Sequence, residues 1–357
     1  MENNTYILKT SKEDLSKVMK EIERKGGKVE YKSPILPIIG FNANESLVGD
    51  LQSDYKIEYI MEADEEGVLL EEGSLTSHFT PLQIMPKVDH VKTRNAGCTG
   101  WGVTVAVLDS GTTMDFVKEK YDFTGFGSDP VVNHGDIVVN IIKRFARGSN
   151  IVSCKVAQYF NGIQLLQVLS GVDFAVNNIK ADIINLSLGF KPKKPCLGNN
   201  CAICDIINAY SQQNGVLFVV AAGNDGEEGS IRCPGNAQES ITVGSISQSP
   251  KAVADYSSKA TPGIKKPNIL TAGSIYYNGE YSEGTSYSTP IVTGVLAAVK
   301  SRKPLSSSQM KDLLYSTADD IDQPFHHQGF GLMNLDRIME VISDGENNSQ
   351  IEGQGES

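Results

Sequence analysis

Four polar side chains have the types and the order along the chain that nucleophilic acyl transfer requires. Asp109 ends the apolar run VTVAVLD, His134 opens the stretch HGDIVVNIIKRF, and Ser286 stands in EGTSYSTP. A serine hydroxyl becomes a nucleophile when a histidine takes its proton and an aspartate orients that histidine. Asn224, at the end of VLFVVAAGN, can donate its side-chain amide to a developing oxyanion.

Each of these residues alone also has an ordinary structural role. An aspartate that ends a strand, or an asparagine that follows a glycine, commonly stabilises a turn. A lone histidine in the first turn of a helix is more often structural than catalytic, and a serine near that position is usually a helix cap. The order Asp, His, Ser, with the Asn between His and Ser, is what favours catalysis.

Alternating strands and helices are predicted to position these residues. Short runs rich in Val and Ile, such as ADIINLSLG and GVLFVVAAGN, alternate with helical stretches such as IQLLQVLSGVDFAVNN. This alternation predicts an α/β fold whose mainly parallel central sheet is covered on both faces. Functional groups gather at the carboxyl ends of such strands, where Asp109 and Asn224 are expected.

A small α/β unit is predicted ahead of this region. TYILKT alternates like a strand, and SKEDLSKVMKEIERKGG is typical of a helix that Ser11 caps. The acidic stretch DEEGVLLEEGSLTSHF follows as a linker, and the polar tail SDGENNSQIEGQGES is predicted to be disordered. We therefore expect three sections, which are residues 1–72, 73–343 and 344–357.

Composition restricts the partners and the compartment. The net charge is −11 and no long Lys/Arg cluster is present, so neither a nucleic acid nor a membrane is expected as a partner. No run reaches the roughly 18 apolar residues that a membrane span needs. The first residues, MENNTYILKTSKEDL, lack the pattern of a signal peptide, which predicts a cytoplasmic protein. Its six cysteines are accordingly expected to be thiols.

The chain resembles subtilisin-like serine proteases over most of its length. VAVLDSG, NHGDIV, INLSLG, VVAAGNDG, KPNILTAG and GTSYSTPIVTGV occur in the order that this family has, and GFGLMNL matches its closing segment. The resemblance implies a three-layer subtilisin-like fold and serine endopeptidase activity. By resemblance, Ser286 attacks the scissile carbonyl and His134 transfers its proton. Asp109 orients the histidine, and Asn224 binds the oxyanion together with the Ser286 backbone N–H.

The first section is similar to the inhibitory propeptide of the family. The resemblance therefore implies a self-inhibited proform, in which the propeptide is an intramolecular inhibitor and the substrate is a peptide or a protein. The substrate is expected to add as a strand beside the SLG segment. The residues implied in substrate binding are Ser187, Leu188, Gly189, Ala222, Gly223, Arg232, Leu165 and Val168.

Arg232 is the residue on which a specificity hypothesis depends. By resemblance it falls near the base of the first pocket, where it would favour an acidic residue before the scissile bond. The alternative is that a longer loop turns it to solvent. The linker supports the first interpretation, because it offers Glu71 or Glu72 before a cleavable bond, with Val68 or Leu69 three residues upstream to enter an apolar fourth pocket.

Some positions depart from the family's pattern. Asp136 stands where threonine is usual. Beside His134 its carboxylate would raise the imidazole pKa, but we expect it to point to solvent at the helix N-terminus, where acids are favourable. The segment from His134 to Lys155 is short, so the family's tight calcium site is expected to be absent, and no cofactor is required for the chemistry. Tyr287 and Ser288 replace the Met and Ala of many relatives, without an explanation from the sequence.

Three cysteines with C-x4-C-x2-C spacing follow the SLGF segment. Cys196, Cys201 and Cys204 suggest zinc, but a structural zinc site needs four ligands, so Cys233 or Cys154 would have to complete it. Zinc, a disulfide and plain surface thiols are the alternatives. We expect plain thiols, and no metal site is assigned.

The resulting prediction is a serine endopeptidase, with alternatives from other classes. Processing of precursor peptides by leader removal and general protein turnover both fit. A peptide-binding pseudoprotease is the non-enzymatic alternative, and an esterase or acyltransferase would use the same triad.

Overall fold

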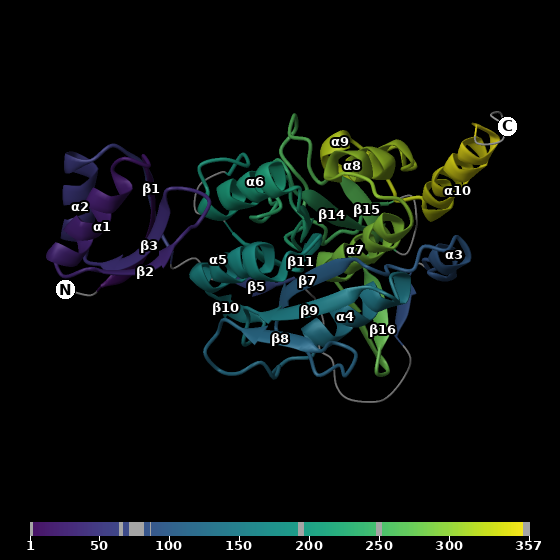
Figure 1. Ribbon diagram of the computed structural model, residues 1–357, viewed down its shortest axis with the longest axis horizontal. Helices are drawn as coiled ribbons and strands as arrows, with labels where there is room; N and C mark the ends of the chain where they lie inside the picture. The colour runs from purple at the N-terminus through teal and green to yellow at the C-terminus, as the bar shows by residue number, and fades with distance from the viewer. Residues whose placement is uncertain are drawn as a thin grey trace.

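The computed structural model describes residues 3–63, 67–70, 82–85, 87–191, 196–247 and 252–352, without the side chains of Met85 and of 344–352. A seven-stranded sheet, in the order β15-β14-β13-β11-β7-β9-β8, lies at the centre of the larger part of the molecule (Figure 1). All neighbouring strands in it are parallel. The strands are β7 (Thr104–Asp109), β8 (Glu119–Asp122), β9 (Asn150–Lys155), β11 (Ile183–Leu186), β13 (Leu217–Ala221), β14 (Ile241–Ile246) and β15 (Ile269–Ala272).

Helices cover both faces of this sheet. Side chains alternate between the faces of a strand, so Val105 and Val107 of β7 join one core, and Ala106 and Leu108 join the other. The first core includes α4 (His134–Phe145) and α7 (Thr285–Arg302), and the second includes α5 (Leu165–Phe174) and α6 (Ala202–Asn214). A π-helical turn, Ala175–Ile179, continues α5. The predicted three-layer α/β fold is confirmed.

The C-terminal helix is longer than predicted. α10 (Leu335–Glu352) projects from the body of the molecule (Figure 1) and includes residues 344–352, which the sequence assigns to a disordered tail. Once the first turns of α10 pack, each further residue joins the helix at little cost in free energy, because helix propagation is far easier than nucleation. Residues 353–357 lie outside the described part. The other helices are α3 (Val91–Asn95), α8 (Ser307–Ser316) and α9 (Phe325–Gln328). Among the described helices, none has the length and apolar character of a membrane span.

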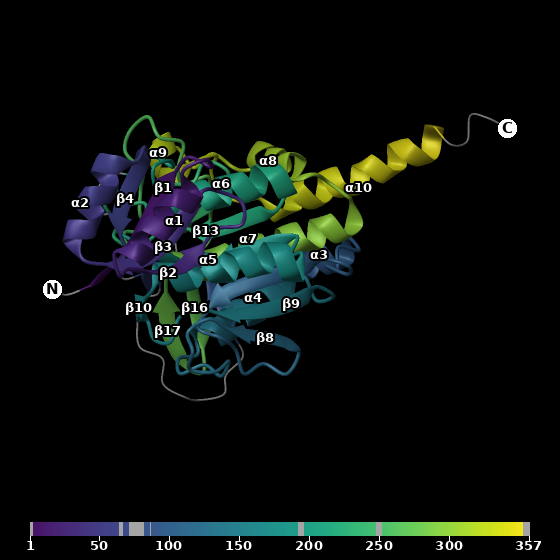
Figure 2. The same ribbon diagram turned by 60° about the vertical axis from the view of Figure 1, so that its left-hand side comes forward.

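The N-terminal residues form a separate small unit. An antiparallel sheet in the order β2-β3-β1-β4 packs under two helices, and its core includes Val18, Ile22, Leu47 and Leu51. The unit lies against α5 and α6 of the larger part (Figure 2). Its elements are β1 (Asn4–Thr10), α1 (Leu15–Arg24), β2 (Lys28–Lys32), β3 (Ile38–Ala43), α2 (Glu45–Asp54) and β4 (Ile57–Glu62).

Part of the predicted linker is a strand. β5 (Gly67–Leu69) lies between β10 (Asn161–Ile163) and β12 (Leu188–Phe190) and is antiparallel to both. A further antiparallel sheet joins β6 (Gln83–Met85), β16 (Ser274–Tyr277) and β17 (Glu280–Glu283). The strand β5 therefore runs beside the SLG segment, where the sequence predicts that substrate adds.

Candidate active site

Asp109 and His134 meet at the carboxyl end of the sheet. Asp109 is the last residue of β7 and His134 is the first residue of α4. Their Oδ1 and Nδ1 atoms are 2.7 Å apart, and both side chains are buried. Asp109 Oδ1 also accepts a hydrogen bond from the N–H of Ser110 at 2.7 Å. A carboxylate on Nδ1 holds the imidazole in the tautomer whose Nε2 can accept a proton.

The prediction that Asp136 points to solvent is wrong. Its carboxylate is buried and accepts hydrogen bonds from the hydroxyl of Thr112 at 2.5 Å and from the N–H and hydroxyl of Thr113, both at 2.7 Å. The loop after β7 folds back over the first turn of α4 and brings these donors, which a buried carboxylate requires. Asp136 thus holds the loop that follows Asp109 against the helix that begins with His134.

Ser286 is the second residue of α7 and is fully buried. Its Oγ makes no hydrogen bond to any described residue, and no side chain caps the start of α7. The hydroxyl therefore does not cap the helix, which was the alternative interpretation. α7 packs beside α4, and the positive end of its dipole favours negative charge near Ser286.

Tyr287 and Ser288 hold the start of α7 in place. The Tyr287 ring lies beside the His134 ring, with a centroid distance of 5.8 Å, and its hydroxyl is 3.2 Å from Ser282 Oγ. Ser288 Oγ is 2.7 Å from Ser245 Oγ, which belongs to β14. These contacts explain the two residues that the sequence left without an interpretation.

The amide of Asn224 is oriented by Thr285. Asn224 Oδ1 accepts hydrogen bonds from the Thr285 N–H at 3.0 Å and from its hydroxyl at 2.9 Å. Asn224 Nδ2 is then left buried, without a partner among the described residues. A buried unpaired donor costs about 1–3 kcal/mol, so a functional reason for this one is expected. Thr285 was missed by the sequence analysis, because this contact joins residues 61 positions apart.

Residues 67–70 of the chain lie between the SLG segment and the start of α7. The Leu70 carbonyl accepts a hydrogen bond from the Ser286 N–H at 3.2 Å, and the Leu70 N–H donates to the Ser187 carbonyl at 3.3 Å. Further along β5, Val68 pairs with Gly189 of β12. Ser187, Leu188 and Gly189 therefore lie beside β5, and their role in binding substrate stays a prediction.

Arg232 lies beside Gly189 and Gly223, close to Leu70. Its backbone N–H donates to the Ala222 carbonyl at 2.9 Å. A Cβ placed on Gly189 would lie 2.7 Å from Arg232 Cβ and 3.2 Å from Leu70 Cδ1. A Cβ on Gly223 would lie 3.1 Å from Arg232 Cγ. The structure thus brings together the residues predicted for the first pocket, with the aliphatic stem of the arginine next to both glycines.

The charge of Arg232 is paired inside the protein. Asp225 accepts from its Nε at 2.6 Å and from its Nη2 at 2.9 Å. Such a two-point pair leaves little free charge for an acidic substrate side chain. The carbonyl at Ser286 belongs to Leu70, whereas Glu71 and Glu72, the residues predicted to precede the scissile bond, lie outside the described residues.

The apolar residues that the sequence predicts near a fourth pocket lie in a core that also includes Leu69 of β5. Leu165, Val168 and Leu188 are buried in one core. Three residues before Leu70 stands Gly67, and a Cβ there would lie 2.6 Å from the ring of Phe190. With Leu70 before the scissile bond, the residue for the fourth pocket is therefore Gly67, which lies against an aromatic ring. The sequence predicts Val68 or Leu69 there, because it places Glu71 or Glu72 before the bond.

Comparison of the sequence with known proteins identifies a family and relatives that match more than half of the chain. The model of the subtilase family matches residues 100–331, more than half of the chain. Subtilisin E of Bacillus subtilis (strain 168) is 27% identical over 340 residues, which cover 88% of this chain and 84% of that protein. A subtilisin of Bacillus pumilus is 29% identical over 265 residues, which cover 67% of this chain and 91% of that protein.

A solved structure shares the fold over nearly the whole chain. The crystal structure of a mutant of the epidermin leader peptide processing serine protease from Staphylococcus aureus matches with a TM-score of 0.72 and 18% identity. The match covers 96% of this chain and 100% of that chain.

Proposed function

Because the chain belongs to the subtilase family and is a serine-type endopeptidase, we propose that Asp109, His134 and Ser286 are its catalytic triad and that Asn224 is an oxyanion donor. The observation that supports this most strongly is the hydrogen bond from the Ser286 N–H to the Leu70 carbonyl at 3.2 Å. It places a peptide carbonyl at the backbone of the proposed nucleophile.

The proposed reaction follows from the positions of these groups. Ser286 Oγ attacks the carbonyl carbon while His134 Nε2 takes the hydroxyl proton, and Asp109 stabilises the imidazolium that forms. The new oxyanion accepts hydrogen bonds from the Ser286 N–H and from Asn224 Nδ2. When the C–N bond breaks, the leaving amine takes the proton from His134. Water then releases the acyl group from Ser286 by the same steps in reverse order.

We further propose that the protein is made as a self-inhibited proform. Lys9 Nζ of the N-terminal unit is 3.0 Å from Asp205 Oδ2, and the Tyr59 hydroxyl donates to the same oxygen at 3.2 Å. The Tyr31 hydroxyl donates to Asp173 Oδ2 at 2.7 Å. These contacts anchor the unit on α5 and α6, while β5 carries its C-terminal end to Ser286. Although burial lowers it, the hydrogen bonds to Asp205 and Glu58 raise the pKa of Lys9 overall.

The preference proposed for the residue before the scissile bond is apolar. An acidic preference would need a free Arg232, but that side chain is paired with Asp225. Leu70 lies beside Gly189, since a Cβ added there would be 3.2 Å from Leu70 Cδ1, so the chain's own segment supplies an example of an apolar occupant. The proposed self-cleavage bond is the one between Leu70 and Glu71.

Processing of precursor peptides is the biological role that we propose first. A solved relative in fold is described as a leader peptide processing protease, and a strand-binding groove suits an extended leader. General protein turnover is the alternative. Cleavage of an extended precursor peptide at one bond, and slow cleavage of an unfolded protein such as casein, would support processing. Equal cleavage of both at many bonds would support turnover.

A fluorophosphonate probe tests the proposed nucleophile. After the N-terminal section is removed, we expect the probe to label Ser286, as located by peptide mass spectrometry. Ser286→Ala should not be labelled, and His134→Ala should be labelled much more slowly. A processed wild-type protein that takes no label would favour the peptide-binding pseudoprotease. Hydrolysis of esters without hydrolysis of peptides would favour the esterase alternative.

A further inference from the structure

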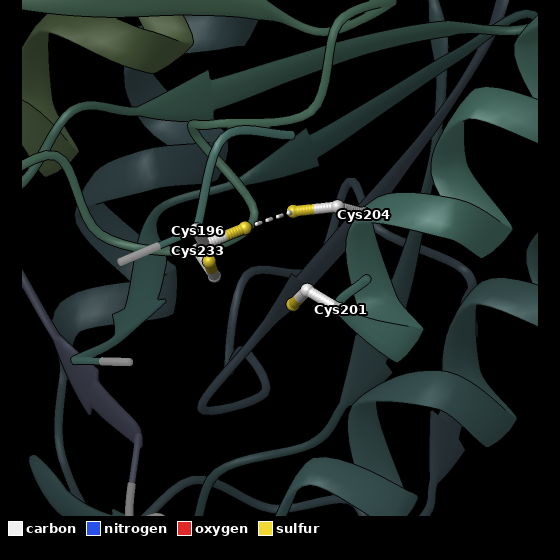
Figure 3. Close-up of side chains that lie close together, drawn as sticks. All are labelled: Cys196, Cys201, Cys204 and Cys233. Atoms are coloured by element: carbon white, nitrogen blue, oxygen red, sulfur yellow. Dashed lines mark hydrogen bonds between the residues drawn. The ribbon is translucent and has the colours of Figure 1, made fainter. Parts of the chain in front are cut away.

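Four of the six cysteines gather at the start of α6 (Figure 3). The Sγ atoms of Cys196, Cys201, Cys204 and Cys233 all lie within 4.8 Å of one another. Cys196 and Cys204 are 3.7 Å apart at sulfur. Cys196 is half-buried and the other three are buried. Thiols from three segments of the chain thus lie close together, and no step of the proposed reaction uses them.

The spacing of the sulfur atoms suits one tetrahedral metal ion. Thiolates bound to zinc at about 2.3 Å stand about 3.8 Å apart at the corners of a tetrahedron. A disulfide requires sulfur atoms at about 2.05 Å, and none of these four cysteines forms one. An iron–sulfur cluster would place several iron and sulfide atoms between the thiolates and hold them further apart.

The sequence spacing agrees with this geometry. Cys196 and Cys201 are separated by four residues, and Cys201 and Cys204 by two, both within the usual range for zinc ligands. Cys233 completes the set, so the expectation of plain surface thiols is replaced here. Cys154 lies in β9, outside this group, where burial raises its pKa to about 12.

We propose that Cys196, Cys201, Cys204 and Cys233 bind one Zn²⁺ ion as a structural site. Four thiolates leave no open position for substrate or water, which distinguishes such a site from a catalytic one. Metal binding removes the thiol protons.

The ion would join parts of the protein that bind the peptide segment. Cys233 exchanges backbone hydrogen bonds with Phe190, the last residue of β12, at 2.7 and 2.9 Å. It also follows Arg232 of the pocket wall, and Cys204 precedes Asp205, to which Lys9 is bound. The proposed zinc therefore holds the wall of the first pocket to the start of α6. This consequence rests on the proposed function, whereas metal binding itself does not.

Metal analysis of the full-length chain tests the proposal. We purify Ser286→Ala protein under reducing conditions, supply Zn²⁺, remove the excess by gel filtration and measure metals by mass spectrometry. We expect one zinc ion per chain. Cys204→Ser and Cys233→Ser should lose it, whereas Cys98→Ser and Cys154→Ser should retain it. A His326→Ala/His327→Ala variant should also retain it, which excludes the surface group of Glu228 and these two histidines.

A second measurement does not depend on whether a cysteine variant folds. Replacement of zinc by Co²⁺ in the otherwise unchanged chain should give the intense visible bands and the thiolate-to-cobalt charge transfer of a tetrahedral thiolate site. Titration with an organomercurial should release the zinc as four thiols are blocked. The proposal would be overturned by a weak octahedral cobalt spectrum or by a chain that binds no zinc. It would also be overturned by a mass that is lower by two hydrogens for each disulfide formed. All of these outcomes are independent of protease activity.

Discussion

At the scale of single residues, the site depends on side chains that orient other side chains. Thr285 holds the Asn224 amide through two hydrogen bonds to Oδ1, so that Nδ2 is the end left to meet an oxyanion. Asp225 pairs with Arg232 and thereby sets the charge of the pocket wall. Neither Thr285 nor Asp225 is proposed to act on the scissile bond directly. Thr285 orients the proposed oxyanion donor Asn224, and Asp225 holds Arg232 beside the predicted first pocket.

Thr285→Val should weaken oxyanion binding without altering the proposed nucleophile. Valine keeps the shape and the backbone N–H but removes the hydroxyl, so the Asn224 amide is held by one hydrogen bond in place of two. We expect kcat on a peptide substrate to fall about 10-fold, the scale of one lost hydrogen bond of about 1.4 kcal/mol, with KM nearly unchanged. Steady-state kinetics of the processed enzyme measure this.

Comparison with Asn224→Ala separates a positioning role from a structural one. Losing the donor itself costs about 10²–10³ in kcat in a subtilisin, the known example. If Thr285 acts through Asn224, the double variant should be no slower than Asn224→Ala alone, and Thr285→Ser should restore activity. Additive losses would mean that Thr285 acts independently of the amide.

Asp225→Asn should change the preference for the residue before the scissile bond. With its carboxylate partner gone, the guanidinium of Arg232 becomes available to a glutamate in the pocket. We expect kcat/KM for a peptide with Glu at that position to rise about 10-fold relative to the same peptide with Leu, the scale of one hydrogen bond to a charged group of about 1.5 kcal/mol. The matched control is Arg232→Gln/Asp225→Asn, which should show no such rise. A wild-type enzyme that already prefers Glu to Leu would contradict our account of the pocket.

At the scale of secondary-structure elements, the site is built from three β-strands and the first turns of two helices. β5 lies between β10 and β12, and its end delivers the Leu70 carbonyl to the first turn of α7. α4 and α7 begin near one another and present His134 and Ser286. The position of the proposed cleavage therefore depends on the register of β5, which a shift of one residue would change.

Gly67→Leu should slow self-cleavage because the added side chain meets the buried ring of Phe190. Even a Cβ would approach that ring to 2.6 Å, so β5 can keep its register only if the ring moves. We expect self-cleavage to slow about 10-fold, as for a modest overpacking cost of 1–3 kcal/mol. Gel analysis over time after expression measures the rate. Phe190→Ala in the same chain should restore it, and a variant that stays slow in both backgrounds would exclude this steric cause.

The sequence predicted the parts of the site that depend on local patterns. Asp109 and the strand it ends, His134 with its helix, and the layers of the fold all follow from apolar periodicity and short motifs. Contacts between distant segments were out of reach, which is why Thr285 was missed and Cys233 could not be chosen over Cys154. Asp136 was misjudged for the same reason, because its donors Thr112 and Thr113 lie in the loop after β7.

At the scale of the whole molecule, the N-terminal section contacts the larger part in two regions. The unit is anchored on α5 and α6 through Asp173 and Asp205, and its continuation enters the groove beside Ser286. One chain therefore contains the proposed enzyme and a segment bound in the manner of a substrate. The register of that segment leads to a single bond, Leu70–Glu71, as the site that we propose for self-cleavage.

The mass and N-terminal sequence of the purified chain, with Ser286→Ala beside the wild type, test this central claim most directly. We predict that the wild type is cut between Leu70 and Glu71, so that the larger product begins at Glu71, and that Ser286→Ala stays full length. A wild type that remains intact under conditions in which it folds would contradict the account. Cleavage after Glu71 or Glu72, or an equal cut in Ser286→Ala, would contradict it as well.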